Sequence, residues 1–372
     1  MNFEFTEDQD VLRTEVRKFL VNEAPLTLAR ATMEDGGERA KAVWGRLAGL
    51  GVTTLMLPPS CGGHGLGALE LCVVAEEVGR QLAPVPLAST LYLAAQALLL
   101  GASQAQQERW LPRIARGDAA TWAAPLDGQW RAEALPVFES GVLRGGAPLV
   151  PDGMAAAFAV VLARDTRSEG LVLVLAELGA RVRRTPRATL DPARPFASFE
   201  FDGVEAEPLD ACADPLALVS AVRERAAILL AFEQLGGADA ALDMAAGYAR
   251  ERRTFGRAIG SYQGIKHKLA DIYTRNQMAR SHCYYGAWAL ASGAPELPLA
   301  AAGARVSASE AFGFAAQENI QTHGGMGYTW EIDCHLFYRR ARQLAVMLGN
   351  VHEWRERLVK GLEAELEAQP PA

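Results

Sequence analysis

A cluster of cationic side chains between two helical stretches is the part of this sequence best suited to chemistry. The segment Arg250–Asp271 holds six Arg and Lys residues against two acids, although the whole chain of 372 residues has a formal charge of −7. We expect a helix to end near Arg253, a turn between Gly256 and Gly260, and a second helix from Tyr262. Guanidinium groups and the backbone N–H groups at a helix start both bind anions. The segment therefore predicts a site for a phosphate-bearing ligand, with a solvated charged face as the alternative.

Composition predicts a soluble globular protein of the cytoplasm. Half of the residues are hydrophobic, yet no apolar run reaches the roughly 20 residues of a membrane helix. The N-terminus lacks the pattern of a signal peptide, and the net negative charge argues against nucleic acid as a partner. The five cysteines form no C-x-x-C pair, which favours reduced structural thiols and gives no reason to expect a metal site.

The periodicity of the apolar residues changes twice along the chain and predicts three domains. These are a helical domain at 1–119, a β domain at 120–212 and a helical bundle at 213–368, which is a mainly α fold with a central β-sandwich or barrel. Thr6 and Gln9 form a capping-box pattern, and Asp214-Pro215 is typical of a helix start. The other expected helices are Ala40–Leu50, Leu69–Gln81, Leu91–Leu100 and Gln104–Ala115, and the expected strands are Phe138–Leu143, Phe158–Leu162, Leu171–Ala176 and Ala197–Phe201.

A glycine-rich stretch, Pro58–Gly67, could be mistaken for a dinucleotide fingerprint. Its Gly63-x-Gly65-x-Gly67 lacks the later spacing and the flanking βαβ unit of that motif. We therefore interpret it as a turn between helices. The carboxylates Glu76 and Glu77 that follow it are expected to be surface or ion-paired groups.

Three blocks of residues, in order along the chain, carry a resemblance to a known family. They are Gly62-Gly63-His64-Gly65 with Glu76-Glu77-Val78-Gly79-Arg80, then Arg252-Arg253-Thr254-Phe255-Gly256 with Tyr262-Gln263 and His267-Lys268-Leu269-Ala270-Asp271, then Gln321-Thr322-His323-Gly324-Gly325-Met326-Gly327-Tyr328 with Arg339-Arg340-Ala341-Arg342. Together they resemble the acyl-CoA dehydrogenase family. The resemblance implies an N-terminal α domain, a middle β domain and a C-terminal four-helix bundle that assembles into dimers or tetramers, with FAD across a subunit interface.

The resemblance also implies an activity and a set of cofactor contacts. The family reaction is the FAD-dependent α,β-desaturation of an acyl-CoA thioester in fatty acid or steroid degradation, with an electron-transfer acceptor. The residues that match the family's FAD contacts are Arg252, Thr254, Phe255, Gln263, Gln321, Gly324 and Gly325. An arginine offers a planar fork to a phosphate, and glycines let the backbone approach a ligand closely.

The catalytic base of the family has no counterpart at either of its two usual positions. Counting from Arg339, the first position is Leu348, and the second is Ala226. Neither side chain can accept a proton, so no catalytic residue is assigned to this chain. The nearest carboxylates, Glu224, Glu331, Asp333 and Glu353, are out of register.

The family's contacts to the flavin ring are also altered in the β domain. A Thr-Glu-Pro stretch becomes Ala124-Pro125-Leu126-Asp127, and an Asn-Gly-x-Lys stretch with its following aromatic becomes Arg144-Gly145-Gly146-Ala147-Pro148-Leu149. Contacts to the AMP half of FAD are kept in the sequence, whereas contacts to the ring are lost.

Four readings follow from this pattern. The first is a degenerate subunit of a heteromeric acyl-CoA dehydrogenase, such as a heterotetramer with a homologous catalytic subunit, similar to the bacterial pairs that act on steroid side chains. The second is a self-sufficient, homo-oligomeric flavoenzyme of the same fold that uses an unusual base. The third is a monooxygenase of this fold, and the fourth is a scaffold subunit that binds no flavin.

Overall fold

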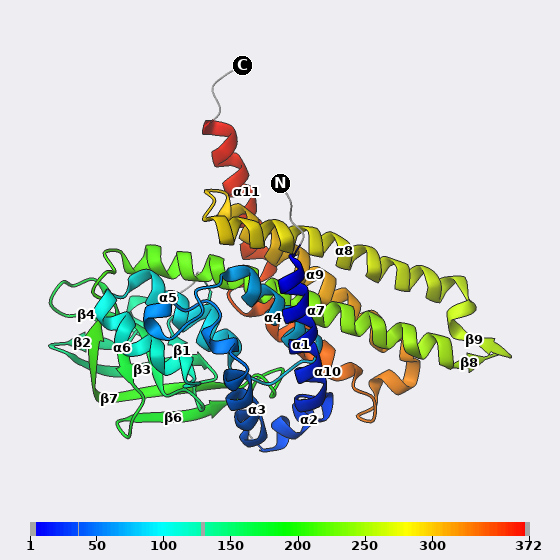
Figure 1. The fold of residues 1–372 in the computed structure, drawn as a ribbon, viewed down its shortest axis with the longest axis horizontal. Helices are drawn as coiled ribbons and strands as arrows, with labels where there is room; N and C mark the ends of the chain where they lie inside the picture. Colours follow the sequence, from blue (N-terminus) through cyan, green and yellow to red (C-terminus); the bar gives the residue numbers. More distant parts are fainter. Residues whose placement is uncertain (1–4, 36, 128–130, 369–372) are drawn as a thin grey trace. The chain divides into compact units, whose positions relative to one another are not determined.

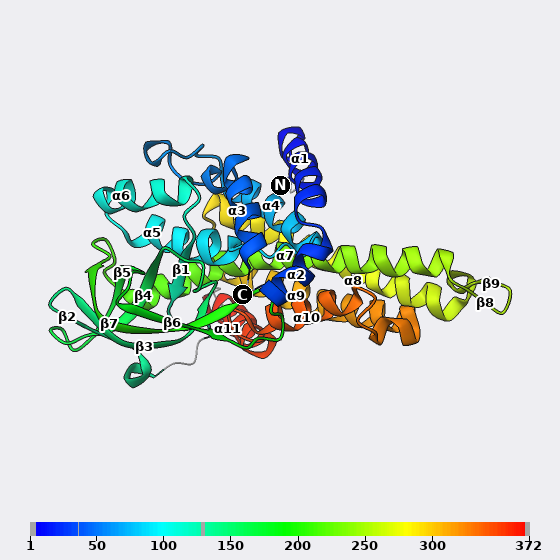
Figure 2. The same cartoon turned by 90° about the horizontal axis from the view of Figure 1, so that it is seen from below.

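Helices come first and last along the chain, and a β region lies between them (Figure 1 and Figure 2). The computed structural model describes residues 5–35, 37–127 and 131–368. Two structural units share these residues: a first unit of Met1–Arg30, Ala68–Ala83 and Ala227–Ala372, and a second unit of Ala31–Gly67 and Pro84–Ala226. The predicted fold class, with helical N- and C-terminal parts and a central β region, is confirmed. The three domain boundaries stay a prediction.

The first unit is built from helices that are long where they form the bundle. Helices α8, α10 and α11 all pack against α9, and α7 and α8 run side by side to the hairpin β8–β9 in both views. Among the described residues, no helix combines the length and apolar character that a membrane crossing requires. The helices of this unit are α1 (Glu7–Glu23), α4 (Ala68–Arg80), α8 (Gln263–Ser292), α9 (Leu297–His323), α10 (Cys334–Val346) and α11 (Val351–Ala368), together with most of α7 (Pro215–Glu251) and the start of α2 (Leu26–Asp35).

Both predicted helix starts are confirmed. The Thr6 hydroxyl accepts a hydrogen bond from the backbone N–H of Gln9, and the Gln9 side chain accepts one from the backbone N–H of Thr6. The Asp214 carboxylate accepts hydrogen bonds from the N–H groups of Leu216 and Ala217. Each cap satisfies donors that the first helical turn would leave without a partner.

Helices α4 and α7 approach each other so closely that glycine is required on both. A Cβ atom on Gly79 would lie 1.8 Å from the carbonyl oxygen of Glu233, and a Cβ on Gly236 would lie 1.8 Å from that of Glu76. Both blocking atoms belong to the backbone, so neither can rotate away. The two backbones therefore pack at a distance that no other residue type permits.

Buried carboxylates beside this contact are paired with arginines. Glu77 receives two hydrogen bonds of 2.7 Å from Arg17, and Glu76 receives one of 2.9 Å from Arg280. The fully buried Glu233 lies 3.6 Å from a guanidinium nitrogen of Arg340, itself only 1% exposed. The ion-paired reading of Glu76 and Glu77 is confirmed, and their burial shows that neither is a surface group.

The five cysteines are free thiols, in agreement with the expected structural role. Burial raises the pKa of the Cys72 and Cys283 thiols well above their ordinary value, and it raises the pKa of Cys334 to about 12. These three thiols stay protonated at neutral pH and are poor nucleophiles.

The second unit combines short helices with a closed β-sheet. Its strands are β1 (Ala120–Ala123), β2 (Val137–Glu139), β3 (Val142–Pro151), β4 (Phe158–Asp165), β5 (Leu171–Glu177), β6 (Val182–Arg187) and β7 (Phe196–Pro208). The strand order is β4-β2-β3-β7-β5, and β5 also pairs with β4, so the sheet closes into a barrel. In addition, β1 pairs with β4 and β6 pairs with β7. Its helices are α3 (Glu38–Gly49), a π-helical turn Ala88–Ala94, α5 (Ala95–Gly101) and α6 (Gln104–Ala115), with the end of α2 and the start of α7.

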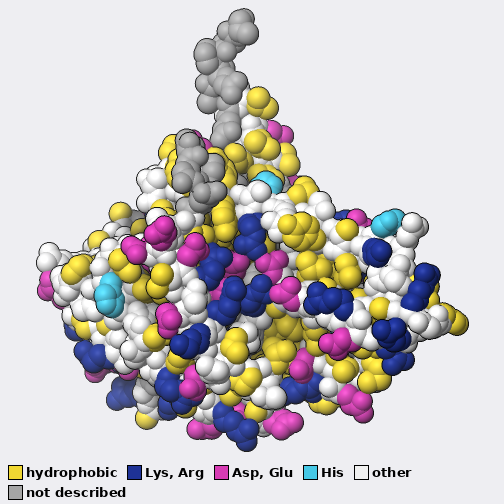
Figure 3. All heavy atoms as spheres, turned by 45° about the vertical axis from the view of Figure 1, so that its right-hand side comes forward, with side chains coloured by type: hydrophobic (Ala, Val, Ile, Leu, Met, Phe, Trp, Pro, Cys, Tyr) yellow, Lys and Arg dark blue, Asp and Glu magenta, His cyan; other side chains and the backbone are white. Residues whose placement is uncertain are grey.

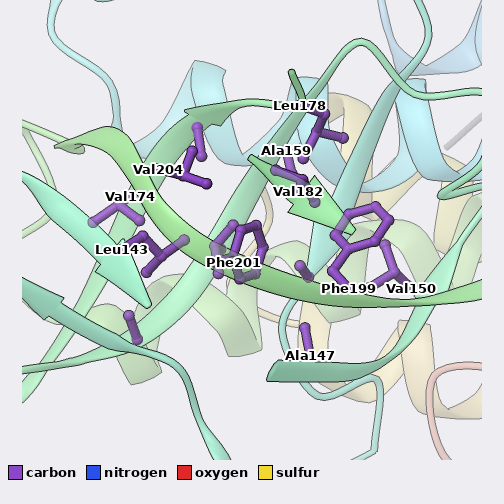
Figure 4. Packing of buried hydrophobic residues seen from close by; sticks show 14 of the residues in the cluster. Leu143, Ala147, Val150, Ala159, Val174, Leu178, Val182, Phe199, Phe201 and Val204 are labelled. Atoms are coloured by element: carbon purple, nitrogen blue, oxygen red, sulfur yellow. The ribbon is translucent and has the colours of Figure 1, made fainter. Parts of the chain in front are cut away.

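The barrel interior is filled by side chains from every wall (Figure 4). Phe199 and Phe201 of β7 meet edge to face with ring centroids 5.8 Å apart. Leu143 of β3, Val174 of β5 and Val182 of β6 belong to the same cluster. The strict alternation predicted for 197–201 thus places the two phenylalanines inside and Ser198 and Glu200 outside.

One expected strand, Phe138–Leu143, is wrong. The chain turns at Ser140 and Gly141, which have φ angles of 50° and 85°, so β2 and β3 form an antiparallel hairpin there. Two consecutive residues with positive φ are typical of the tight turn that matches strand twist. The segment reads Phe-Glu-Ser-Gly-Val-Leu, and its Ser140-Gly141 pair is a dipeptide typical of turns that the strand prediction overlooked.

The close contact of α4 and α7 gives a stability prediction. We expect Gly236→Ala to lower the melting temperature clearly, because over-packing of a core costs about 1–3 kcal/mol. The matched control is Gly247→Ala on the same helix, where an added Cβ meets nothing within 4 Å and alanine favours the helix by about 1 kcal/mol. Equal melting temperatures of the two variants would show that the contact is not this tight in solution.

Candidate functional site

The cationic segment forms a hairpin at the end of two bundle helices. Helix α7 ends at Glu251, β8 (Arg253–Thr254) pairs with β9 (Arg257–Ala258), and a 3-10 turn, η5 (Ile259–Ser261), leads into α8. The expected helix, turn and helix are present, but the two short strands between them were not predicted. Figure 3 shows Lys and Arg side chains, in dark blue, among hydrophobic ones on the right-hand part of the molecule, where this end of the first unit lies.

The hairpin turn holds Phe255 in an unusual backbone conformation. Phe255 and Gly256 have φ angles of 52° and 80°, and the register pairs Thr254 directly with Arg257. This two-residue turn favours Asn-Gly, whereas a left-handed conformation costs another residue roughly 1–2 kcal/mol. The Phe255 side chain is 93% exposed, so packing within the chain does not offset this cost. The ring is therefore available for contact with a group outside the chain.

The predicted cations of the hairpin are available for a ligand. Arg252 is exposed and, among the described residues, forms no ion pair. Its backbone N–H donates to Tyr248 and its carbonyl accepts from Ile259, each at 2.8 Å, so the position of its Cα is fixed. The Arg257 guanidinium lies 3.9 Å from the centre of the Tyr262 ring. Gln263 is exposed at the first position of α8, where no side chain caps the helix.

The second predicted motif lies beside the first. Helix α9 ends at His323, whose ring stacks on Tyr248 of α7 with a centroid distance of 4.1 Å. Lys268 of α8 and Glu318 of α9 form an ion pair of 2.5 Å. These two contacts bring the end of α9, with Gln321, to the end of the bundle that carries the hairpin. No pattern in the sequence indicates the Tyr248–His323 stack.

The loop after α9 has the open backbone that a ligand needs. Gly324 adopts φ 59° and ψ −138°, a conformation open almost only to glycine. A Cβ added to Gly324 or Gly325 would meet no atom within 4 Å. Within the described parts of the chain, no neighbouring atom requires glycine at position 325. A ligand that approaches the backbone closely would require it. Exposed cations, two bare glycines and a displayed aromatic ring fit the phosphate and adenine parts of a dinucleotide.

The position assigned to the family base is buried and apolar. Leu348 is 1% exposed, and it has a φ of 65° in the turn between α10 and α11. Its carbonyl accepts a hydrogen bond of 3.0 Å from the Trp354 indole. The second assigned position, Ala226 on α7, is fully buried. Neither position presents a group that can exchange a proton.

A buried arginine that the sequence did not single out holds the Leu348 turn. Arg305 of α9 is fully buried and donates to the carbonyls of Leu344 and Met347. It also donates to Gln234 and Ser309, and burial lowers its pKa to about 9. An arginine near a helix C-terminus binds carbonyls that the helix leaves free. No pattern in the sequence around Arg305 indicates that this arginine is buried or that it binds these carbonyls.

The four out-of-register carboxylates lie in different surroundings. Asp333 forms an ion pair of 2.5 Å with Arg30, and Glu331 is exposed. Glu224 accepts a hydrogen bond from Ser220 one turn earlier on α7. Glu353 lies in the first turn of α11. The ion pair with Arg30 gives Asp333 a structural role.

The altered flavin-ring segments lie in the second unit. Leu126 is 8% exposed, whereas Leu149 of β3 is 51% exposed. Both are aliphatic, and neither offers a hydrogen bond to a ring nitrogen or oxygen.

Comparison with known proteins agrees with this picture. Residues 6–118 match the model of the acyl-CoA dehydrogenase N-terminal domain and residues 217–362 that of the C-terminal domain. The chain is 34% identical to acyl-CoA dehydrogenase IpdE2 of Mycobacterium tuberculosis over 98% of this chain and 99% of the relative.

Two solved assemblies have the same fold. A Tcur3481–Tcur3483 steroid ACAD variant is 29% identical with a TM-score of 0.84, covering 98% of this chain and 99% of that one. One chain of the ChsE4–ChsE5 complex of Mycobacterium tuberculosis is 26% identical to this chain, with a TM-score of 0.83. The match covers 100% of this chain and 100% of that one.

The turn at Phe255 gives a prediction that separates folding from ligand binding. Phe255→Asn should keep the turn and leave the melting temperature of the lone chain unchanged or raised, since asparagine tolerates positive φ and no packing is lost. The same variant should release FAD more readily, measured as flavin absorbance per chain after gel filtration. Phe255→Val, which does not tolerate positive φ, is the control and should destabilise the chain. Full flavin content in Phe255→Asn would rule out a ligand role for the ring.

Proposed function

Because this chain belongs to the acyl-CoA dehydrogenase family, an FAD-binding family of oxidoreductases, we propose that it is the base-lacking subunit of a heteromeric acyl-CoA dehydrogenase. In this proposal it contributes a grip for the nucleotide end of FAD to the assembly. A homologous subunit contributes the carboxylate that removes the α-proton of the acyl-CoA thioester. An electron-transfer acceptor then reoxidises the flavin.

The single observation that carries the proposal is the state of Leu348. A catalytic base must reach a proton on the substrate and carry a suitable pKa. The side chain at this position is an alkyl group with 1% exposure, in a turn fixed by Trp354 and Arg305. An alkyl side chain buried in a turn that the bundle interior fixes is what we expect of a subunit whose partner supplies the base.

The buried carboxylates of the first unit support the same reading. Glu76, Glu77 and Glu233 each lie against an arginine. Using any of them as a base would break a buried ion pair, at a cost of about 3–5 kcal/mol.

The chain's own residues give the proposal a defined cofactor role. Bound FAD would supply the acceptor for the β-hydride, which protein side chains cannot provide. Arg252 would offer its guanidinium fork to a phosphate, with Thr254 and Gln263 as polar neighbours and Phe255 as an apolar face. Gln321, Gly324 and Gly325 would allow close approach of the dinucleotide to the backbone.

Steroid-derived acyl-CoA esters are the substrate class that we propose. Support comes from the 29% identity over nearly the full length to a steroid ACAD assembly of two differently named chains. The likeness to the ChsE4–ChsE5 complex favours a heteromeric rather than a homo-oligomeric state. The alternatives of a self-sufficient flavoenzyme, a monooxygenase and a flavin-free scaffold predict other results in the two experiments below.

The first experiment measures what the chain does alone and with a partner. We expect the lone chain to show little bleaching of the flavin absorbance on addition of a steroid side-chain acyl-CoA. Co-expression with a homologous, base-containing subunit should restore bleaching. The assembly should hold fewer than one FAD per chain, because each complete site combines residues of two different subunits. Robust turnover by the lone chain would refute the proposal, and an assembly without flavin would favour the scaffold.

The second experiment tests the dinucleotide grip in the assembled enzyme. Arg252→Ala should lower FAD retention about tenfold or more, since a charge-assisted hydrogen bond to a phosphate contributes roughly 1.5–3 kcal/mol. The matched control is Arg167→Ala, an exposed arginine of the β domain, which removes the same charge and should leave flavin content unchanged. Equal retention in both variants would contradict the assignment of Arg252.

A further inference from the structure

A pocket on the outer face of the β barrel has no role in the proposed function. Its volume is about 590 Å³, within the range of roughly 300–1,000 Å³ found for small-molecule sites. Strands β2, β3, β4, β6 and β7 and the turn η4 (Ala132–Ala134) all contribute to its lining. Four of the lining residues are arginines, namely Arg144, Arg164, Arg183 and Arg187.

The strand register explains why the four arginines share one face. Val137 of β2 pairs with Arg144 on one side and Arg164 on the other, and paired residues point to the same face of a sheet. On β6, Arg183 and Arg187 are four residues apart, so they also point to one face. Register with β7 places Arg183 opposite Glu200, which projects away from the core filled by Phe199 and Phe201.

Two glycines on β3 make the hollow. Gly145 and Gly146 line the pocket without side chains. A Cβ at Gly146 would lie 3.2 Å from a carboxylate oxygen of Glu200, and one at Gly145, with φ 100°, would lie 3.4 Å from the Pro136 backbone. An ordinary solvated sheet face would carry side chains at these two positions. The hollow therefore distinguishes the pocket from an ordinary solvated face.

The guanidinium groups in the pocket are not neutralised within the chain. Glu133 and Glu200 also line it, so four cations face two anions and the local charge is +2, against −7 for the whole chain. Arg183 and Glu200 are direct cross-strand neighbours, yet across the described parts of the chain none of the four arginines forms an ion pair. The pocket thus offers several forked donors to an anion from solution.

We propose that this pocket binds a diphosphate ester. One carboxylate could engage one or two of the arginines, whereas a diphosphate carries enough charge and acceptor oxygens to engage several at once. The apolar wall of Leu135, Val137 and Pro148 suits the organic group of the ester. The site uses none of the residues assigned to the nucleotide end of FAD. It includes Arg144–Pro148, part of the segment in which the resemblance places the family's lost flavin-ring contacts. Binding of a separate diphosphate ester there goes beyond the proposed function.

Calorimetric titration of the full-length protein with inorganic pyrophosphate and with ADP tests the proposal. Both should bind saturably, with ADP tighter because of the apolar wall. Arg183→Ala/Arg187→Ala should weaken both at least tenfold, whereas Arg116→Ala/Arg167→Ala, which removes the same charge from exposed positions outside the lining, should change affinity less than twofold. Glu200→Gln should tighten binding several-fold by removing a repelling charge.

Three results would overturn the proposal. The first is the absence of saturable binding of either probe. The second is equal weakening by the two double variants, which would indicate a general charge effect. The third is loss of binding in Arg252→Ala with full binding in Arg183→Ala/Arg187→Ala, which would place the anion at the FAD grip instead. The failure of the heteromer proposal would leave these measurements unaffected, because they use neither flavin nor a second subunit.

Discussion

The first unit depends on a buried cation, Arg305, which forms no ion pair with the residues that the structure describes. Arg305 joins Gln234 of α7 and Ser309 of α9 to the carbonyls of Leu344 and Met347 at the end of α10. An isolated buried charge is costly unless its donors are satisfied, and here carbonyl, amide and hydroxyl oxygens engage both Nη groups, while Nε has no partner among the described residues. The turn that carries Leu348 is therefore set by the interior of the bundle rather than by a substrate or cofactor. In the proposed function, such a turn could persist after the loss of its acid, because the contacts that hold it do not involve the side chain of Leu348.

Much of the architecture could be predicted from local patterns, and the reasons are local. The caps at Thr6 and Asp214, the helix Gln104–Ala115 and the strand over 197–201 follow from side-chain chemistry within a few residues. The β2–β3 turn was missed although Ser140-Gly141 is a dipeptide typical of turns, because Phe138–Leu143 was interpreted as a single strand. The β8–β9 hairpin has a weaker sequence signal, because Phe255 occupies a turn position where asparagine is usual.

The candidate site was only partly accessible to sequence reasoning. Motif spacing identified Arg252, Phe255, Gly324 and the empty base position Leu348, because each is defined by its order along the chain. The stack of Tyr248 on His323 and the role of Arg305 join residues about 40 to 75 positions apart, and no periodicity encodes such contacts. The arginine pocket depends on strand register across five strands, which also escapes a linear reading. Site residues that are defined by their order along the chain can be found from the sequence. Contacts between distant segments can be found only from the folded structure.

The outermost strand of the barrel has a consequence for how this protein behaves at high concentration. Within the described residues β6 pairs only with β7, so one side of it remains a free sheet edge, of the kind that invites a strand from another molecule. Its sequence is Val-Arg-Arg-Thr-Pro-Arg, in which proline removes a backbone donor and three like charges repel an identical strand. The cationic character of this strand thus also guards against intermolecular β-sheet growth, and neutralising it would expose the protein to fibrous aggregation.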